Sequence, residues 1–336
     1  MIIVDSYPVA VAMCVVTMIC WGSWGNTQKL AGVKWKFQLF YWDYVLGILL
    51  FSLIFAFTLG SFGAGGRSFL ADMSQADAKW LISAFEGGVI FNGANILLVA
   101  AIDIAGLAVA FPVGIGLALV LGVITTYAAR PEGDVEMLAF GVALICVAIV
   151  LDAIAFGRTG GKASSLKGLA ISAAAGVLMG FFYSFVANSM GRLDASSGVA
   201  VLEAGKLSAY SAMVLFSLGI FISNFFFNGL AMRFPPAGGG RVGMGEYFSL
   251  GTPRLHAVGI LGGAIWCVGT TFSFIAAEPV GAALSYGLGQ GAIMVSALWG
   301  VFVWKEFKGA PRGTGAILAA MFASFAAGLA VLVCAR

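Results

Sequence analysis

Two asparagines stand in a stretch that is otherwise apolar, EGGVIFNGANILLVAAI (86–102). On a helix, residues i, i+4 and i+7 share one face, so Gly88, Asn92 and Asn95 form a single stripe. Amide side chains on such a stripe can do one of two things. They either hydrogen-bond a neighbouring helix, which contributes only about 0.6 kcal/mol on average, or they line a hydrated cavity. The stripe therefore marks a candidate binding site for a neutral, hydrogen-bonding solute.

Three carboxylates also fall inside apolar stretches. Glu86 lies about 200° from Gly88 around the helix and about 9 Å along its axis from Trp80, so it does not share the stripe. It either snorkels to the interface or carries a coupled proton. Asp43 and Asp152 lie nearer the ends of their stretches, where an interfacial position is the commoner explanation. The candidate proton-coupling residues are Glu86 and Asp43.

Aromatic and amide residues elsewhere extend the candidate site. The segment CWGSWGNTQKL (20–30) carries Trp24, whose ring could stack on a sugar or a heterocycle, although an interfacial aromatic belt accounts for many such tryptophans. Tyr286 and Gln290 are i, i+4 neighbours, and a buried glutamine is costly unless it pairs. The candidate substrate-binding residues are Trp24, Asn92, Asn95, Asn188, Thr270, Tyr286 and Gln290.

The sequence lacks the residue groups that metal sites and enzymes use. Its one histidine, His256, cannot build a zinc site alone, and its five cysteines form no CxxC pair. The Gly-rich segment GGGRVGMGEY (238–247) lacks the GK[ST] ending of a phosphate-binding loop. A membrane-embedded enzyme, the alternative from another class, would need a clustered acid, base or nucleophile. We therefore expect no catalytic residue, no metal and no cofactor.

Composition places these residues in a lipid bilayer. The chain is 61% hydrophobic and 10% charged, with a mean hydropathy of +1.01, whereas soluble domains carry about 25% charged residues. A soluble core cannot absorb so much apolar side chain. The net charge of +3 is too small and too scattered to indicate a nucleic-acid partner. The opening MIIVDSYP lacks the basic region of a cleaved signal, so the first apolar segment is expected to remain as a span.

Ten apolar segments are each long enough to cross a bilayer, for which a helix needs about 20 residues. They predict an all-α polytopic membrane protein with ten transmembrane helices. The alternation typical of a membrane β-barrel is absent. The predicted spans are 7–26, 39–59, 80–102, 105–127, 135–156, 168–188, 208–230, 255–276, 281–303 and 314–334.

The distribution of positive charge predicts the orientation. An even number of spans puts both termini on one side of the membrane. The connections after the odd-numbered spans hold twelve Lys and Arg residues, and the other side holds six. Positive residues favour the cytoplasm, so both termini are expected outside.

The chain also contains an internal repeat. A shift of 175 residues lays the third and fourth spans onto the eighth and ninth without a gap, and it puts Thr270 at the stripe position of Asn95. A repeat of five spans must insert upside down, which is the arrangement of alternating-access carriers with a midplane site. The predicted halves are residues 1–157 and 168–336, joined by 158–167 into one interlocked transport unit. Matching pairs are Gly87 with Gly262, Gly88 with Gly263, Asp103 with Glu278, Phe111 with Tyr286 and Gly114 with Gly289.

Four motifs carry a resemblance to a known family: CWGSWGNTQKL (20–30), WDY (42–44), GGVIFNGAN (87–95) and SALWGVFVWKEFK (296–308). They resemble the drug/metabolite transporter superfamily, most of all its bacterial sugar-uptake and rhamnose-symporter branch and the related plant ureide permeases. The resemblance covers essentially the whole chain and implies a five-plus-five inverted repeat of ten helices and proton-linked import of small neutral solutes. The short 158–167 join lacks the long hydrophilic loop of ureide permeases, which favours the sugar branch. The best-matching residues are Trp24, Asp43, Gly87, Gly88, Asn95, Trp299 and Glu306.

The sequence thus predicts a secondary active transporter in the bacterial inner (plasma) membrane, not an enzyme. Its expected cargo is a small neutral polar solute, a sugar first, imported with protons. Two alternatives keep the fold: a ureide or nucleobase permease, and a drug or metabolite exporter. Oligomeric state is left open.

Overall fold

The structure is a computed structural model that describes the chain except for residues 33–34, 64, 106, 160–165, 195–200, 236–239 and 336. Most of the predicted 158–167 join lies outside the described residues. Within the described ranges, ten helical segments are long and apolar enough to cross a membrane. The predicted all-α polytopic fold is therefore confirmed, and each predicted span has its counterpart.

Most spans are single helices, whereas the first and the ninth are broken. The first span divides into α1 (Tyr7–Ser23) and α2 (Gly25–Ala31). The ninth divides at Gln290 into α12 (Ala282–Gly289), α13 (Ala292–Leu298) and a π-helical turn, η1 (Trp299–Val303). The others are α3 (Phe37–Phe57), α5 (Ala78–Ala105), α6 (Leu107–Ala129), α7 (Val135–Gly157), α8 (Leu166–Ser189), α9 (Ala209–Arg233), α11 (Pro253–Val280) and α14 (Thr314–Cys334).

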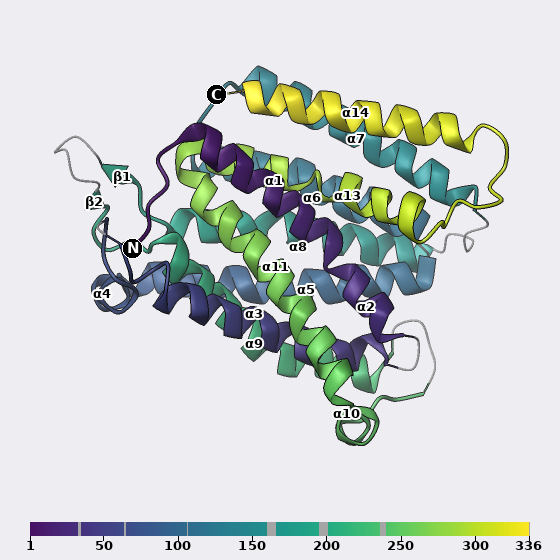
Figure 1. The fold of residues 1–336 in the computed structure, drawn as a ribbon, viewed down its shortest axis with the longest axis horizontal. Helices are drawn as coiled ribbons and strands as arrows, with labels where there is room; N and C mark the ends of the chain where they lie inside the picture. The colour runs from purple at the N-terminus through teal and green to yellow at the C-terminus, as the bar shows by residue number, and fades with distance from the viewer. Residues whose placement is uncertain are drawn as a thin grey trace.

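Short elements lie between the spans. They are α4 (Phe69–Gln75), α10 (Met244–Leu250) and the antiparallel pair β1 (Leu193–Asp194) and β2 (Val201–Leu202). Both chain ends lie at one end of the bundle together with α4 and the β-pair, whereas α10 lies away from it (Figure 1). We call the end with the termini the terminal face. The opposite end, where the Lys- and Arg-rich connections after the odd-numbered spans lie, is the basic face.

Local sequence explains where the helices begin. Asp134 precedes α7 and accepts hydrogen bonds from the backbone N–H groups of Glu136 (2.9 Å) and Met137 (3.1 Å), as an N-cap residue does. Thr252 caps α11 in the same way. Pro253 occupies the first helical position, where a backbone N–H group would have no partner within the helix, so proline costs no hydrogen bond there. Gly281, at φ +98°, separates α11 from α12, and that backbone conformation suits glycine.

Glycines bring two pairs of helices into direct backbone contact. A Cβ at Gly88 of α5 would lie 2.0 Å from the Phe216 carbonyl oxygen of α9, and a Cβ at Gly263 of α11 would lie 2.0 Å from the Tyr44 carbonyl oxygen of α3. Each partner helix returns a glycine to the crossing. These glycines are Gly219, where a Cβ would lie 2.1 Å from the Phe85 carbonyl oxygen, and Gly47, where a Cβ would lie 2.3 Å from the Ile260 carbonyl oxygen. Such close approach by small residues is how membrane helices gain packing energy without a hydrophobic driving force.

The packing has a register that matches the sequence repeat. Helix α5 spans 78–105 and α11 spans 253–280, an offset of 175 residues at both ends, and α6 and α12 begin with the same offset. Helix α5 packs on α8 and α9, and α11 packs on α1 and α3. The division of the chain into two inverted halves stays a prediction that this register agrees with.

Candidate functional site

A cavity of about 1210 Å³ lies among the helices and reaches the basic face. Its inner wall comes from α1, α5, α8, α11 and α12, with Trp21, Phe91 and Tyr286 among the lining side chains. Its outer wall includes Lys36 and Thr159, which lie in or beside the connections at the basic face. The volume exceeds that of a sugar or a ureide, so solute and water fit together in it.

Aromatic rings form the deep wall of the cavity. Trp21 stacks parallel to Trp266 with ring centroids 6.3 Å apart, and Phe91 lies 4.7 Å from Trp266. On the α3 side, the ring of Trp24 packs on Tyr44 at 4.6 Å. Planar rings of this kind offer flat faces on which a planar or ring-shaped solute can stack.

Amide groups supply the hydrogen-bonding part of the wall. Asn95 lines the cavity and donates through Nδ2 to the Tyr41 hydroxyl at 3.0 Å. The Tyr41 hydroxyl donates in turn to Asn92 Oδ1 at 2.9 Å. Asn92 donates to Ser223 at 2.9 Å and does not reach the cavity. Asn92 therefore holds Tyr41, and Tyr41 holds Asn95, whose carbonyl oxygen is left for a solute.

The structure brings together four of the seven predicted binding residues. Trp24, Asn95, Tyr286 and Gln290 line the cavity. Gln290 sits at the α12–α13 break, and the Tyr286 hydroxyl donates to the Ala118 carbonyl at 3.1 Å.

The other three predicted residues lie behind or outside the cavity wall. Thr270 is one hydrogen bond behind it, because Trp21 Nε1 donates to the Thr270 hydroxyl at 2.9 Å. Asn92 is two hydrogen bonds behind it, through Tyr41 and Asn95. Asn188 is half-buried near the terminal end of α8 and is not among the lining residues.

The predicted proton-coupling carboxylates lie away from the cavity lining. Glu86 is exposed on the outer surface of α5. Asp43 is 1% exposed and accepts from Tyr247 of α10 and from His256 Nδ1 of α11, the latter at 3.0 Å. Burial and then the neighbouring Asp43 carboxylate raise the pKa of Tyr247, so its hydroxyl remains a donor. This cluster fastens α10 to the bundle.

Sequence reasoning missed several cavity residues. Trp266, Phe91 and Phe182 line the wall, but phenylalanine and tryptophan are too frequent here to stand out. Trp266 lies four residues before Thr270, so the helical stripe could have indicated it. Asp152 also lines the wall. Its position late in α7 favoured an interfacial explanation, so the sequence did not indicate it as a cavity residue.

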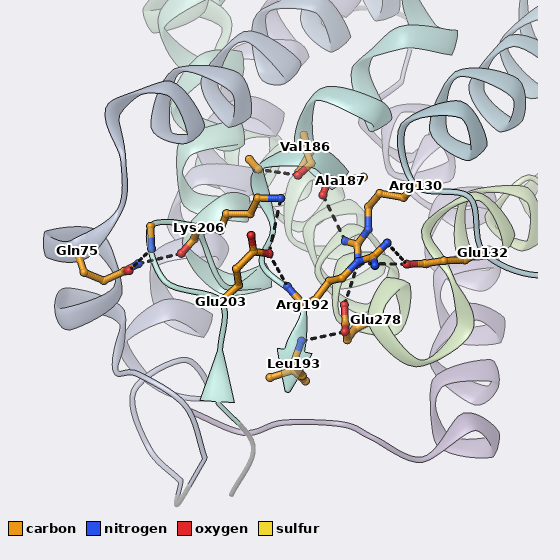
Figure 2. A network of polar contacts seen from close by, with 12 residues as sticks. Gln75, Arg130, Glu132, Val186, Ala187, Arg192, Leu193, Glu203, Lys206 and Glu278 are labelled. Carbon is orange, nitrogen blue, oxygen red and sulfur yellow. Dashed lines mark hydrogen bonds and ion pairs between the residues drawn. The ribbon is translucent and has the colours of Figure 1, made fainter. Parts of the chain in front are cut away.

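The terminal face is closed by a polar network (Figure 2). Arg130, just after α6, has a side chain only 7% exposed and pairs with Glu278 of α11 at 3.1 Å. It also contacts Glu132 at 3.5 Å and the Ala187 carbonyl at 3.4 Å. Glu132 pairs with the exposed Arg192 at 3.0 Å. These contacts join α6, α8 and α11 where they end.

Glu278 extends the network to the β-pair, accepting at 2.9 Å from the backbone N–H of Leu193 (Figure 2). Next to it, Lys206 contacts Glu203 at 3.7 Å.

A second layer lies between this network and the cavity. The Tyr183 and Ser273 hydroxyls are 2.9 Å apart, and Ser273 lies 3.2 Å from Ser285. Cys14 of α1 is 1% exposed, and its Sγ lies 3.7 Å from the Ser285 hydroxyl oxygen. The cavity is thus open toward the basic face and sealed by two polar layers toward the terminal face.

Comparison with known proteins identifies a family. The family model described as ureide permease matches residues 157–335. The chain is 22% identical over 391 residues to Ureide permease 1 of Arabidopsis thaliana, with 99% of this chain and 98% of that protein covered. Ureide permease 4 of the same plant is also 22% identical, over 397 residues, with the same coverage. A solved structure known only as "Crystal structure of protein" shares the fold, with a TM-score of 0.61, 17% identity and 97% and 96% of the two chains covered.

Proposed function

The chain belongs to the ureide permease family and is a membrane transporter of small solutes, and from this premise we propose that it moves one neutral, hydrogen-bonding solute through the central cavity by alternating access. One observation carries the proposal. The cavity that holds the amides and aromatic rings is open toward the basic face and closed toward the terminal face. A carrier must reach such a state at one stage of its cycle, because a passage open to both faces would let solute run through freely.

The lining favours a planar, amide-rich solute. Asn95 and Gln290 each carry both a donor and an acceptor, which complement the N–H and C=O groups of a ureide. Trp24 and Trp21 offer ring faces for the flat part of such a molecule. The names of the two plant relatives point the same way. We therefore place a ureide ahead of the sugar that the sequence alone favoured, with a sugar as the second candidate because it too stacks on tryptophan.

The inverted repeat supplies a route between the two states. The reciprocal glycine crossings of α5 with α9 and of α3 with α11 make two similar pairs. The same offset of 175 residues places Lys305 opposite Arg130 and Asp103 opposite Glu278 in the two halves. In inverted-repeat carriers the halves exchange conformations to change access. We propose that the basic face closes when the Arg130–Glu278 pair opens.

Orientation and coupling complete the proposal. We propose that the basic face lies in the cytoplasm, because positive residues favour that side; this state then faces inward and both termini lie outside. The solute then enters the cell, with a proton as the coupling ion, in a bacterial inner membrane.

Uptake into proteoliposomes tests the choice of solute. Labelled allantoin, uracil, rhamnose and glucose are offered to the wild type, to Asn95→Ala and to Gln290→Ala, with Asn188→Ala as the control outside the cavity. We expect saturable entry of allantoin, a higher KM in both cavity variants and an unchanged KM in the control. Saturable entry of a sugar alone would reject the ureide. Equal KM values in all four proteins would reject the cavity as the binding site.

A further inference from the structure

The cavity wall contains a carboxylate that the solute site does not use. Asp152 of α7 lines the cavity although the residue is only 5% exposed. Its Oδ1 is fully buried and has no hydrogen-bond partner among the described residues. A buried polar group without a partner is rare in a folded protein and calls for an explanation.

The other two carboxylates that the sequence offered inside apolar stretches, Asp43 and Glu86, do not share this position. Asp43 is held by Tyr247 and His256 behind the wall, and Glu86 lies on the outer surface of α5. Among these three, Asp152 alone lies on the path that a solute takes through the described part of the cavity.

Among the residues that the structure describes, few charged groups surround Asp152. Glu306, which follows η1, lines the same cavity and opposes a negative charge on Asp152. Glu306 forms an ion pair with Lys29, also on the wall. Arg158, six residues further along, donates to the Arg312 carbonyl instead.

The neighbouring helices add no charge. The sequences of α6 and α14, which pack on α7, contain no Asp, Glu, Lys or Arg. The titratable side chains of α6 and α14 are Tyr127 and Cys334. Both belong to the C-terminal ends of these helices, at the end of the bundle away from Asp152.

Because the Asp152 carboxyl group is buried and its Oδ1 has no partner among the described residues, the transport cycle tolerates its ionised and protonated forms differently. An unpaired ion removed from water neutralises itself by changing its protonation state. In the present state, Asp152 lines a cavity that is open toward the basic face, the side from which water enters it. When both faces close around a bound solute, that water is lost, and an ionised Asp152 would oppose closure. A protonated Asp152 would not.

We propose that Asp152 binds the proton that crosses with the solute, an inference that rests on the proposed function and deepens it. With the cavity open to the terminal face, water delivers a proton and an O–H bond forms on the carboxylate. After the change of access, the bond breaks and the proton leaves to water at the basic face. For the return of the empty carrier, Lys29 leaves Glu306, whose side chain is 32% exposed and stays hydrated, and neutralises Asp152.

The test compares accumulation with exchange in proteoliposomes. For one proton per solute, a gradient of one pH unit supports up to about tenfold accumulation. We expect the wild type to approach that ratio and Asp152→Asn to stay near 1. Asp152→Asn should still exchange internal for external solute, because an amide resembles the protonated acid. The matched controls Glu86→Gln and Asp43→Asn should accumulate like the wild type once corrected for the amount of folded protein.

A pH-sensitive dye inside weakly buffered vesicles gives the second readout. Adding solute to the wild type should acidify the vesicle interior, whereas Asp152→Asn should move solute without protons. Asp152→Glu, which restores an ionisable group, should recover part of the signal.

Two results would overturn the assignment. The first is full accumulation by Asp152→Asn. The second is that this variant, while still folded, loses both exchange and accumulation. Wild-type exchange without any accumulation under a proton gradient would reject coupling and leave the transporter standing. Absence of any wild-type transport would reject the proposed function itself.

Discussion

The ion pair between Arg130 and Glu278 should control how often the terminal face opens. The variant Glu278→Gln keeps the size of the side chain and an acceptor for the Leu193 N–H group, but removes the charge. Arg130 would retain Glu132 at 3.5 Å and the Ala187 carbonyl at 3.4 Å, both at the outer limit of a hydrogen bond.

The expected size of the effect follows from that loss. A hydrogen bond to a charged group contributes about 1.5–3 kcal/mol, and every 1.4 kcal/mol is about tenfold in a population. If the pair exists only while the terminal face is closed, Glu278→Gln should raise the open population about 10- to 150-fold. The control Glu132→Gln removes the charge that pairs with the exposed Arg192, 59% of whose side chain is accessible, and that contacts Arg130 only at the long distance of 3.5 Å. An exposed pair contributes about 0–1 kcal/mol, so the change should stay below about fivefold.

The native Cys14 reports this opening. It is buried in the second polar layer and does not line the cavity, so we expect a thiol reagent to reach it only when the terminal face opens. With the other four cysteines replaced, the labelling rate of Cys14 is measured on purified protein in detergent. Faster labelling in Glu278→Gln than in Glu132→Gln is the expected result. Equal rates in the wild type and both variants would refute the idea that the pair is a gate.

Three further predictions concern other parts of the molecule. Gly88→Ala should lower the free energy of unfolding by about 1–3 kcal/mol, because the added Cβ would lie 2.0 Å from a carbonyl oxygen. Gly116→Ala should not, because the added Cβ would lie 3.9 Å from its nearest atom. Thermal unfolding in detergent compares the two variants, and equal midpoints would contradict the close helix crossing at Gly88. Asn95→Ala should raise the KM for the solute about tenfold, the worth of one hydrogen bond, with the amount of folded protein unchanged; a lower kcat at constant KM would argue against direct binding. His256→Ala should destabilise the protein by about 1.5–3 kcal/mol, since the Asp43 carboxylate loses a hydrogen-bond partner, while transport per folded molecule persists. Selective loss of transport would show that the cluster does more than fasten α10.

Sequence reasoning works best where the physics is collective. Ten spans follow from length and hydropathy alone, because a bilayer core tolerates only helices with satisfied backbones or closed barrels. The stripe of Gly88, Asn92 and Asn95 was identified from helical spacing, and the structure separates its members by depth. Gly88 makes the helix crossing, Asn95 reaches the cavity, and Asn92 holds Tyr41 behind it.

What depends on a few interhelical contacts escaped prediction. Asp43 and Asp152 look alike in sequence, each near the end of a span. One meets a histidine 213 residues away. The other lines the cavity, and its Oδ1 has no hydrogen-bond partner within the described part of the chain. Nothing in their local sequence encodes that difference, since it arises from which helix packs beside each one. The Arg130–Glu278 pair, 148 residues apart, was hidden for the same reason.

The central claim is that solute crosses the membrane by a carrier cycle. The decisive measurement is the initial rate of labelled allantoin entry into proteoliposomes with and without unlabelled allantoin inside. A carrier whose cavity faces one side at a time should show a saturable rate that internal solute accelerates, because the loaded protein returns faster than the empty one. A rate that rises linearly with concentration and ignores internal solute would indicate an open passage, and would contradict alternating access through this cavity.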